Sequence, residues 1–490
     1  MIGAWAQDER KRWAILMTVG IGSIMSPLDS SVVNIALPVI TADLNTTITV
    51  AEWVAAAYLL TISSLLLTYG RAGDLWGHRH IYVTGFAVFT AGSLLCSLSS
   101  NIGLLIAFRV VQAIGAGMMM AAGPALITAA FPANERGRAL GLNGMMVGVG
   151  LAAGPVLGGL LVQLSGWRSI FLINLPIGLA GIWLAHRILP YPAPDRRRRR
   201  FDVSGAATFF IALLSLLLAL SRGDTWGWRS APITVLWIIG LLAFVSFFHI
   251  ERRVADPMVD LHLFRIRLFA AANGSALLNY MAQFTVTFLM PFYLQQALGL
   301  PPQQAGLILL AFPVFMLLMA PFSGALSDRL GSYILSPLGM LIITVGLWLL
   351  SRLTGTTDPG SIFWRLAIVG LGSGLFQAPN NSAIMGSVPK DRLGLASGML
   401  ATMRNVGMVL GVAVSAAVFS SRHDFYLYQE MTGRMFAYDA GLTPYVAAVR
   451  DTFLVGSGFA LLGVVTAMVR GRPGTGTGSQ NRQAQQGEAD

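Results

Sequence analysis

The sequence predicts an all-α protein that crosses a membrane many times. Of the 490 residues, 55% belong to the hydrophobic set AVILMFWYC and only 11% are charged, whereas about 25% of the residues of a soluble domain are charged. The apolar residues also gather in runs that match the length of a bilayer-spanning helix, about 20 residues. Composition and run length together exclude a soluble enzyme, a secreted scaffold and a disordered chain.

Taken in order along the chain, the apolar runs give about fourteen expected spans. The first begins near Trp13 and exceeds the apolar core of a signal peptide, about 7–15 residues, so we expect it to remain as a helix. The approximate limits of the spans are 14–38, 52–71, 81–99, 103–131, 139–163, 170–190, 203–221, 232–250, 269–297, 304–326, 333–353, 362–386, 396–420 and 450–470.

The basic residues predict how these spans are oriented. An even number of spans places both termini on one side, and arginine and lysine mark the cytoplasmic side. With cytoplasmic termini, the outer loops keep few basic residues: Arg168, Arg222, Arg229, Arg352, Arg422, Arg434 and Arg450. We therefore expect a multi-pass protein of the cell membrane with both termini in the cytoplasm. The net charge of +11 then needs no nucleic-acid partner.

The central loop contains the basic run Arg196–Arg200. This run either attracts anionic membrane lipids, at about 1 kcal/mol per charge, or only fixes the topology. The tail 471–490 is polar and glycine-rich, so we expect it to be disordered. The single cysteine, Cys96, excludes a disulfide framework and a cysteine metal site, and we expect neither a metal nor a cofactor.

A short loop pattern occurs twice in the chain. G-x-x-x-D-x-x-G stands at Gly70–Gly77 and again at Gly324–Gly331, each time after an even-numbered span. A second pair of glycine sets has nearly the same separation: Gly141, Gly150 and Gly154 against Gly398, Gly407 and Gly411. We therefore predict two parallel six-helix halves, 1–190 and 269–470. The segment 191–268 between them would hold the basic loop and two extra helices.

Five motifs follow one another on the expected helices and loops: Leu28–Pro38, Gly70–Arg79, Arg109–Gly115, Gly150–Gly159 and Trp167–Gly178. With them the chain resembles the drug:H⁺ antiporter-2 family, the fourteen-helix multidrug exporters of the major facilitator superfamily, up to about residue 470. The middle three are similar to that superfamily's motifs A, B and C. The resemblance implies a major facilitator fold and proton-coupled export of amphipathic drugs or toxic compounds.

Asp29 is the only acid well inside the first span. Burying a carboxylate there costs about 2.5–3.5 kcal/mol even on a mild insertion scale. Such an acid is a candidate proton carrier or a counter-charge for a cationic substrate. The alternative is a structural aspartate that is hydrogen-bonded to Asn34 or to a neighbouring helix.

Arg109 lies a few positions into the fourth span. The resemblance implies a role in proton coupling, because a buried guanidinium next to a carboxylate would promote release of its proton. The alternative is an arginine that extends to the outer membrane interface.

Two motifs predict moving parts. In motif A, Gly70, Asp74 and Arg79, with Asp328 and Arg329 in the repeat, could form a charge network that is broken in one conformation and acts as a gate. A solvated tight turn is the alternative. In the antiporter motif, Gly150, Gly154, Gly158 and Gly159 would let two helices approach closely, and Pro155 would kink the helix.

A substrate cavity is expected where polar side chains lie inside the spans. Adaptable aromatic side chains suit varied amphipathic ligands, although plain helix packing is the alternative for each of them. The expected lining is Asp29, Asn34, Tyr58, Asn143, Asn279, Gln283, Phe284, Phe312, Gln377 and Asn380.

Two other classes of function compete with drug export. An exporter or flippase of a native lipid or metabolite would use the same scaffold, because fold does not settle substrate. A membrane enzyme or receptor lacks support, since the sequence has no paired acids, metal cluster or ATP-binding loop. We expect a monomer that is driven by the proton gradient and surrounded by membrane lipids.

Overall fold

The computed structural model describes residues 9–132, 135–189, 202–254, 261–388, 393–432 and 443–469. Within these ranges every regular element is a helix, and twelve helices are long and apolar enough to cross a membrane. The chain is thus a multi-pass helical membrane protein. Two expected spans are not among the twelve. The described apolar run of one, Ser204–Leu220, is shorter, and the other, Arg267–Phe292, carries Asn273, Asn279 and Gln283.

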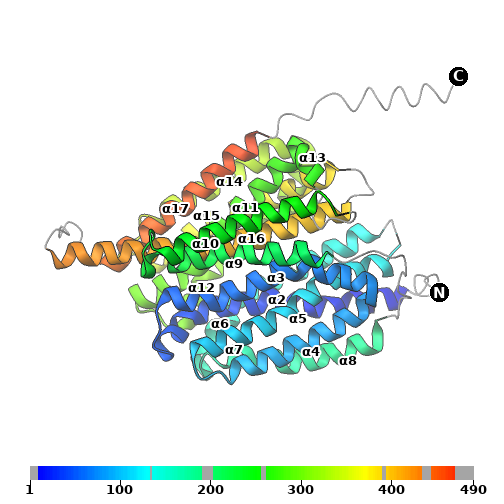
Figure 1. The fold of residues 1–490 in the computed structure, drawn as a ribbon, viewed down its shortest axis with the longest axis horizontal. Coiled ribbons are helices and arrows are strands. Elements are labelled where there is room, and N and C mark those ends of the chain that lie inside the picture. Colours follow the sequence, from blue (N-terminus) through cyan, green and yellow to red (C-terminus); the bar gives the residue numbers. More distant parts are fainter. Residues whose placement is uncertain are drawn as a thin grey trace.

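The N-terminal helices form one group, shown in blue to cyan-green (Figure 1). Within it α4 packs on α5 and α8, α2 packs on α6, and α3 packs on α5. We call this set the N-terminal group. Its helices are α2 (Glu9–Asp43), α3 (Ile48–Trp76), α4 (His78–Ser97), α5 (Ile102–Ala130), α6 (Arg136–Ser165), α7 (Ser169–Leu172) and α8 (Asn174–Ile188).

The C-terminal helices form a second group on the other side of the molecule (Figure 1). Here α14 and α13 pack on α15, α11 packs on α16, and α17 packs on α14 and α11. We call this set the C-terminal group. Its elements are α11 (Arg267–Phe292), the π-helical turn η2 (Tyr293–Ala297), α12 (Pro302–Leu309), α13 (Ala311–Leu330), α14 (Ser332–Leu350), α15 (Pro359–Gly386), α16 (Leu393–Met431) and α17 (Pro444–Met468).

Two helices lie between the groups in the sequence. α9 (Val203–Trp226) and α10 (Ala231–Glu251) pack on each other. α9 also contacts α3 of the N-terminal group and α16 of the C-terminal group, so the pair lies along the seam at the front of Figure 1. A 3₁₀ turn, η1 (Leu261–Arg265), precedes α11. The basic run at 196–200 and the tail 471–490 lie outside the described residues.

Two expected spans are each interrupted at one residue, three positions before a proline, although each remains a single membrane-crossing segment. Segment 170–190 divides at Ile173 into α7 and α8, and segment 304–326 divides at Leu310 into α12 and α13. Pro176 and Pro313 lack the amide proton that would bond the carbonyl four residues earlier, and their rings crowd that carbonyl. Those carbonyls belong to Leu172 and Leu309, where α7 and α12 end.

α16 is longer than its apolar run. The sequence predicts a span over 396–420, but the helix continues to Met431, and its end projects beyond the neighbouring helices (Figure 1). The added residues include Arg422, Asp424 and Glu430, which are exposed. Hydropathy detects the membrane-crossing part of a helix, so a polar continuation outside the bilayer escapes it.

Candidate functional site

Asp29 and Arg109 form an ion pair inside the N-terminal group. Arg109 Nη1 lies 2.5 Å from Asp29 Oδ2, and both side chains are fully buried. Asp29 comes from the middle of α2 and Arg109 from the outer part of α5, and the two helices pack together. The pair is therefore enclosed by protein rather than exposed to lipid or water.

Three polar side chains complete the coordination of the pair. Gln112 Nε2 and Asn174 Nδ2 each donate to Asp29 Oδ1 at 2.8 Å. Gln112 also accepts from Arg109 Nη1 at 2.6 Å and donates to Ser93 Oγ at 2.7 Å. Four helices, α2, α4, α5 and α8, thus contribute to one polar cluster. We call Asp29, Ser93, Arg109, Gln112 and Asn174 the Asp29 cluster.

Aromatic rings enclose the guanidinium of Arg109. Its Cζ atom lies 4.0 Å from the ring centroid of Tyr58 and 5.8 Å from that of Phe171. Arg109 Nε donates to the Val54 carbonyl at 3.0 Å, whereas Nη2 has no hydrogen-bond acceptor among the described residues. The Tyr58 hydroxyl lies 3.0 Å from Ser26 Oγ on α2. A cation over aromatic faces is stabilised without a further acceptor.

The cluster surrounds the Asp29 carboxyl group with hydrogen-bond donors. Arg109, Gln112 and Asn174 each donate one N–H to the Asp29 carboxyl oxygens, and the donor of Arg109 is a charged guanidinium. Removing one partner of a buried ion pair costs about 3–5 kcal/mol, because the other charge stays buried alone. Protonating Asp29 would leave the charge of Arg109 buried without a counter-charge. Proton binding and the packing of these helices are therefore energetically linked.

The structure excludes the interfacial alternative for Arg109, whereas for Asp29 both a proton carrier and a structural aspartate bonded to a neighbouring helix fit these contacts. Arg109 is fully buried and points inward, so it does not extend to the membrane interface. Asp29 is bonded to Asn174 of α8 rather than to Asn34, whose Nδ2 donates to the Ser30 carbonyl of its own helix. The Asp29 carboxylate faces α5 and α8, and its place in a substrate cavity stays a prediction.

The other residues predicted to line a cavity are spread over both groups. Asn143 accepts from Ser23 Oγ at 2.6 Å, and Gln377 donates to the Tyr280 hydroxyl at 2.6 Å. Asn279 and Gln283 are buried on α11, as is Asn380 on α15. The Phe284 Cβ lies close to Gly411 of α16, and the backbone carbonyl of Phe312 lies close to Gly370 of α15. These contacts are of the kind that helix packing makes, and the cavity stays a prediction.

In motif A the structure describes Arg79 but not its expected acidic partner. Arg79 is buried and its Nη2 donates to the His186 carbonyl at 2.5 Å, near the end of α8. It thus ties α4 to α8. Gly77 has φ +93° between α3 and α4, where a side chain would be strained, and a Cβ at Gly70 would meet open space. The side chains of Asp74, Asp328 and Arg329 lie outside the described set.

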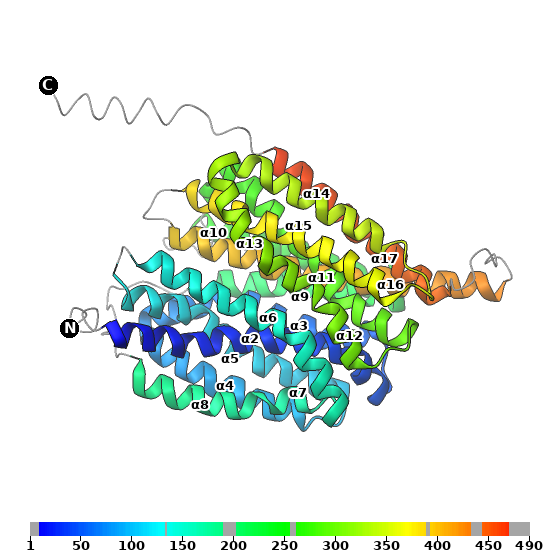
Figure 2. The same cartoon turned by 180° about the vertical axis from the view of Figure 1, so that it is seen from behind.

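The antiporter motif lies at two helix contacts. Cβ atoms at Gly150, Gly154 and Gly158 would collide with α2 at Ile24, Ser31 and Ile35 respectively. Gly159 instead meets the Pro302 carbonyl of α12, and Gly306 of α12 meets the Pro155 carbonyl. The motif therefore packs α6 against α2 within its group and against α12 across the groups, where the two helices meet in the view of Figure 2. Helix α6 is continuous through Pro155.

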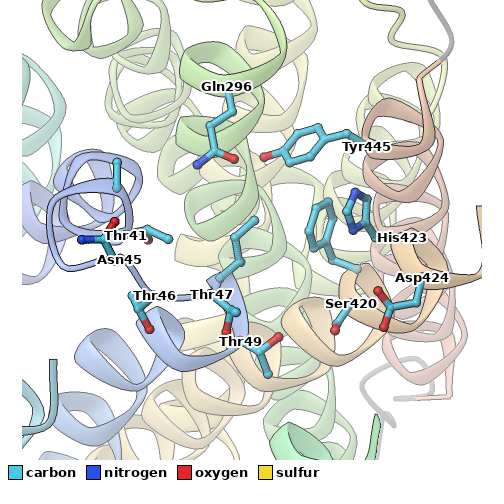
Figure 3. A pocket seen from close by; sticks show the side chains of 13 residues that line it. Thr41, Asn45, Thr46, Thr47, Thr49, Gln296, Ser420, His423, Asp424 and Tyr445 are labelled. Atoms are coloured by element: carbon cyan, nitrogen blue, oxygen red, sulfur yellow. The ribbon is translucent and has the colours of Figure 1, made fainter. Parts of the chain in front are cut away.

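A pocket of about 560 Å³ opens at the end of the molecule where α2 turns into α3. Figure 3 shows Gln296 and Tyr445 directed into it opposite the threonines of that turn. Both groups contribute to it, and sequence reasoning missed it because its residues are far apart in the chain. The lining is Thr41, Ala42, Asn45, Thr46, Thr47, Ile48, Thr49, Gln296, Phe419, Ser420, His423, Asp424 and Tyr445.

Sequence reasoning also missed three members of the Asp29 cluster as functional residues. Gln112 and Asn174 lie within quoted motifs, so a polar residue at a fixed place in an apolar motif was the available signal. Ser93 carried no such signal, because a lone serine in a helix commonly bonds its own backbone.

Known proteins resemble the chain over most of its length. The model of the Major Facilitator Superfamily matches residues 19–250 and 272–487. The riboflavin transporter RibZ of Clostridioides difficile is 35% identical over 93% of this chain and 97% of its own. The multidrug resistance protein Stp of Mycobacterium tuberculosis is 33% identical, over 84% and 76%. The tetracenomycin C resistance and export protein of Streptomyces glaucescens is 32% identical over the same shares.

The fold is also found among solved structures. A bacterial homologue of the human lysosomal transporter Spinster has a TM-score of 0.67 at 15% identity, covering 94% of this chain and 97% of that one. Three observations agree on one assignment. The described regular elements are all helices, a polar cluster is buried among them, and the relatives are transporters and exporters. The chain belongs to the Major Facilitator Superfamily and is a transporter rather than an enzyme.

Proposed function

We propose that the protein is a proton-coupled exporter of amphipathic drugs or toxic compounds. The observation that carries this proposal is the enclosed pair of Asp29 and Arg109, 2.5 Å apart. When a carboxylate is held against a guanidinium inside a helix bundle, a proton that binds to the carboxylate weakens the ion pair. Proton binding can therefore be coupled to a change in helix packing. Relatives that export drugs, such as Stp and the tetracenomycin C protein, support the substrate class.

The exchange would run as a cycle. In the conformation described here the Asp29 carboxyl group is paired with Arg109. When the opposite side of the membrane becomes accessible, a proton from outside would neutralise Asp29 and release the guanidinium from it. Each proton that enters down 100 mV supplies about 2.3 kcal/mol, enough for roughly a fifty-fold gradient of a neutral substrate. No cofactor is needed in this cycle.

The arrangement in the membrane is part of the proposal. We propose fourteen spans, counting α9 and α11, arranged as two six-helix halves with α9 and α10 inserted between them. The bias of arginine and lysine supports cytoplasmic termini in the cell membrane. We also propose a monomer as the functional unit, embedded in membrane lipids.

A second candidate function is export of a native metabolite. The observation that favours it is the 35% identity to a riboflavin transporter over nearly the whole length of both chains. A drug-susceptibility panel and a measurement of riboflavin in the medium, each with and without the gene, separate the two. Drug protection without riboflavin release supports the first candidate, and the reverse supports the second.

Efflux of a fluorescent amphipathic dye from vesicles with an imposed pH gradient tests the coupling. We expect the parent protein to transport uphill with the gradient and to stop when the gradient is collapsed. Asp29→Asn, which is permanently neutral, should keep its membrane level and lose the pH-driven component. Uphill transport by Asp29→Asn at the parent rate would show that coupling lies elsewhere.

A further inference from the structure

The segment Trp167–Gly178 contributes Phe171 and Asn174 to the surroundings of the buried pair, and it also contacts the end of α2. We propose that this segment is a clamp on α2, and that Asn174 within it is a positioning residue that holds the Asp29 carboxylate in its ionised form. The inference rests on the proposed proton coupling, because it names what regulates the proton at that site. The segment connects the end of α6 to the first turn of α8.

The outer end of the clamp holds the end of α2. Trp167 Nε1 donates to Asp43 Oδ2 at 2.8 Å, and Arg168 Nη1 lies 3.3 Å from the same oxygen. Arg168 Nη2 also donates to the Ser99 carbonyl at 3.3 Å, and its guanidinium stacks 4.2 Å from the ring centroid of Trp167. One short segment thus fixes the end of α2 to the connection between α4 and α5.

The inner end of the clamp touches both members of the buried pair. Phe171, fully buried, places its ring 5.8 Å from Arg109 Cζ. Asn174, which is 1% exposed, donates Nδ2 to Asp29 Oδ1 at 2.8 Å. Asp29 and Asp43 lie on the same helix, so the segment holds α2 at two separate points.

The local sequence explains why Asn174 reaches Asp29. Pro176 removes one backbone hydrogen bond to the Leu172 carbonyl, and the helix resumes as α8 at Asn174 after the single residue Ile173. Gly178, one turn later, lies directly against Thr90, and a Cβ there would collide with the threonine hydroxyl. The missing side chain lets α8 approach α4 closely, which brings Asn174 into the interior.

The chemistry of the amide selects one protonation state. An N–H donor stabilises a carboxylate oxygen more strongly than the oxygen of a neutral acid. Gln112 comes from the same helix as Arg109 and moves with it, whereas Asn174 comes from α8. Loss of the Asn174 bond on protonation would therefore free α8 from α2, and a shift of α8 would in turn favour protonation.

The other groups that face the pair do not supply this link. Tyr58 of α3 covers Arg109, and the thiol of Cys96 on α4 lies 3.8 Å from Gln112 Oε1. Both groups are neutral at ordinary pH. From α6, α11 and α12, which also pack against α2, no ionisable side chain makes a described contact with Asp29.

The test is the pH dependence of substrate-induced proton release from the full-length protein in detergent, with the same dye as the probe. Asn174→Leu removes one donor to a charged acceptor. We expect the midpoint of proton release to move to higher pH by about one unit, a tenfold change in proton affinity. Asn174→Asp places a second carboxyl beside Asp29, so the two share a proton and the shift should be larger.

The control is Asn273→Leu in α11. Asn273 is fully buried and donates one hydrogen bond to the Phe269 carbonyl. Asn273→Leu therefore removes one buried amide donor, as Asn174→Leu does. Asn273 lies far from Asp29 in the sequence and belongs to the other helix group. This variant should keep the parental midpoint. If Asn174→Leu does not fold, Asn174→Ser, a shorter side chain with a weaker donor, should show a smaller shift in the same direction.

The outcomes separate the inference from the proposed function. A parental midpoint in Asn174→Leu and Asn174→Asp, in a protein whose parent form releases protons, overturns the clamp inference alone. Absence of proton release from the parent, or parental release from Asp29→Asn, overturns the coupling proposal and the clamp inference with it. An equal shift in Asn273→Leu would assign the effect to general loosening of the bundle and would also overturn the inference.

Discussion

The two helix groups pack alike but carry different chemistry. In the N-terminal group Gly150 of α6 lies against Ile24 of α2, and in the C-terminal group Gly407 of α16 lies against Leu277 of α11. Five residues further along, α2 has Asp29 and α11 has Ala282, both buried. The close helix approach occurs in both groups, and among the described residues at this place a buried carboxylate occurs only in the N-terminal group.

The arginines of the two groups show the same difference. Arg109 of α5 is fully buried and paired with Asp29, whereas Arg365 of α15 is half-buried and donates Nη1 to the Leu349 carbonyl at 2.9 Å. A carbonyl satisfies a guanidinium that reaches water, but an enclosed guanidinium requires a counter-charge. If the proposed coupling holds, the N-terminal group would carry the proton-sensitive element and the C-terminal group would serve as its scaffold partner.

The largest expected effect comes from breaking the pair on one side only. Arg109→Leu leaves Asp29 buried without its counter-charge and should lower the free energy of unfolding by about 3–5 kcal/mol, with loss of pH-driven efflux. The matched change Arg365→Leu should cost less than about 1.5 kcal/mol, since it removes one hydrogen bond to a backbone carbonyl. Thermal unfolding in detergent and dye efflux measure both. Similar losses in the two variants would contradict the asymmetry.

The second prediction tests the shared packing. Gly154 and Gly411 hold equivalent places, since a Cβ at the first would collide with Ser31 of α2 and one at the second would lie within 2.7 Å of the Met281 carbonyl of α11. Gly154→Val and Gly411→Val should therefore destabilise the protein by similar amounts, about 1–3 kcal/mol each. The midpoint of thermal unfolding is the measurement, and Gly274→Ala, at a glycine with open space, is the control. A large effect in one variant alone would show that the packing is not duplicated.

The third prediction concerns the contact between the groups. Gly306 of α12 lies against the Pro155 carbonyl of α6, and Gln295 donates to the Ile35 carbonyl at 2.9 Å at the same end. Gly306→Val should hold the groups apart there and favour the conformation that is open at this end. A cysteine at Thr46, in the pocket of Figure 3, should then react with a water-soluble maleimide several-fold faster. An unchanged labelling rate would show that this contact does not close the molecule.

The smallest effect is expected at the outer end of the clamp. Arg168 and Asp43 are 44% and 48% exposed in their side chains, and exposed ion pairs contribute about 0–1 kcal/mol. Asp43→Asn should shift the midpoint of proton release by less than half as much as Asn174→Leu, and 1 M salt should have little effect on the mutant. A shift equal to that of Asn174→Leu would mean that the outer contact controls the site.

The sequence by itself determined the class of the protein and the two charged residues of its site. A bilayer requires apolar runs of a set length, and a charge inside such a run is costly enough to stand out, so Asp29 and Arg109 could be singled out without coordinates. The repeat could be recognised because close helix approach needs small residues at fixed spacing, as at Gly150 and Gly154. The superfamily assignment predicted from the motifs is confirmed.

Only the tertiary structure decided which residues meet. The bonds from Asp29 to Arg109, Gln112 and Asn174 join positions 80, 83 and 145 residues apart, and no local pattern encodes such pairs. Asp29 bonds to α8 because Asn174 in the first turn of that helix is buried beside it. Hydropathy reports where a helix crosses the membrane, whereas the direction of each side chain depends on the neighbours that fill the space around it.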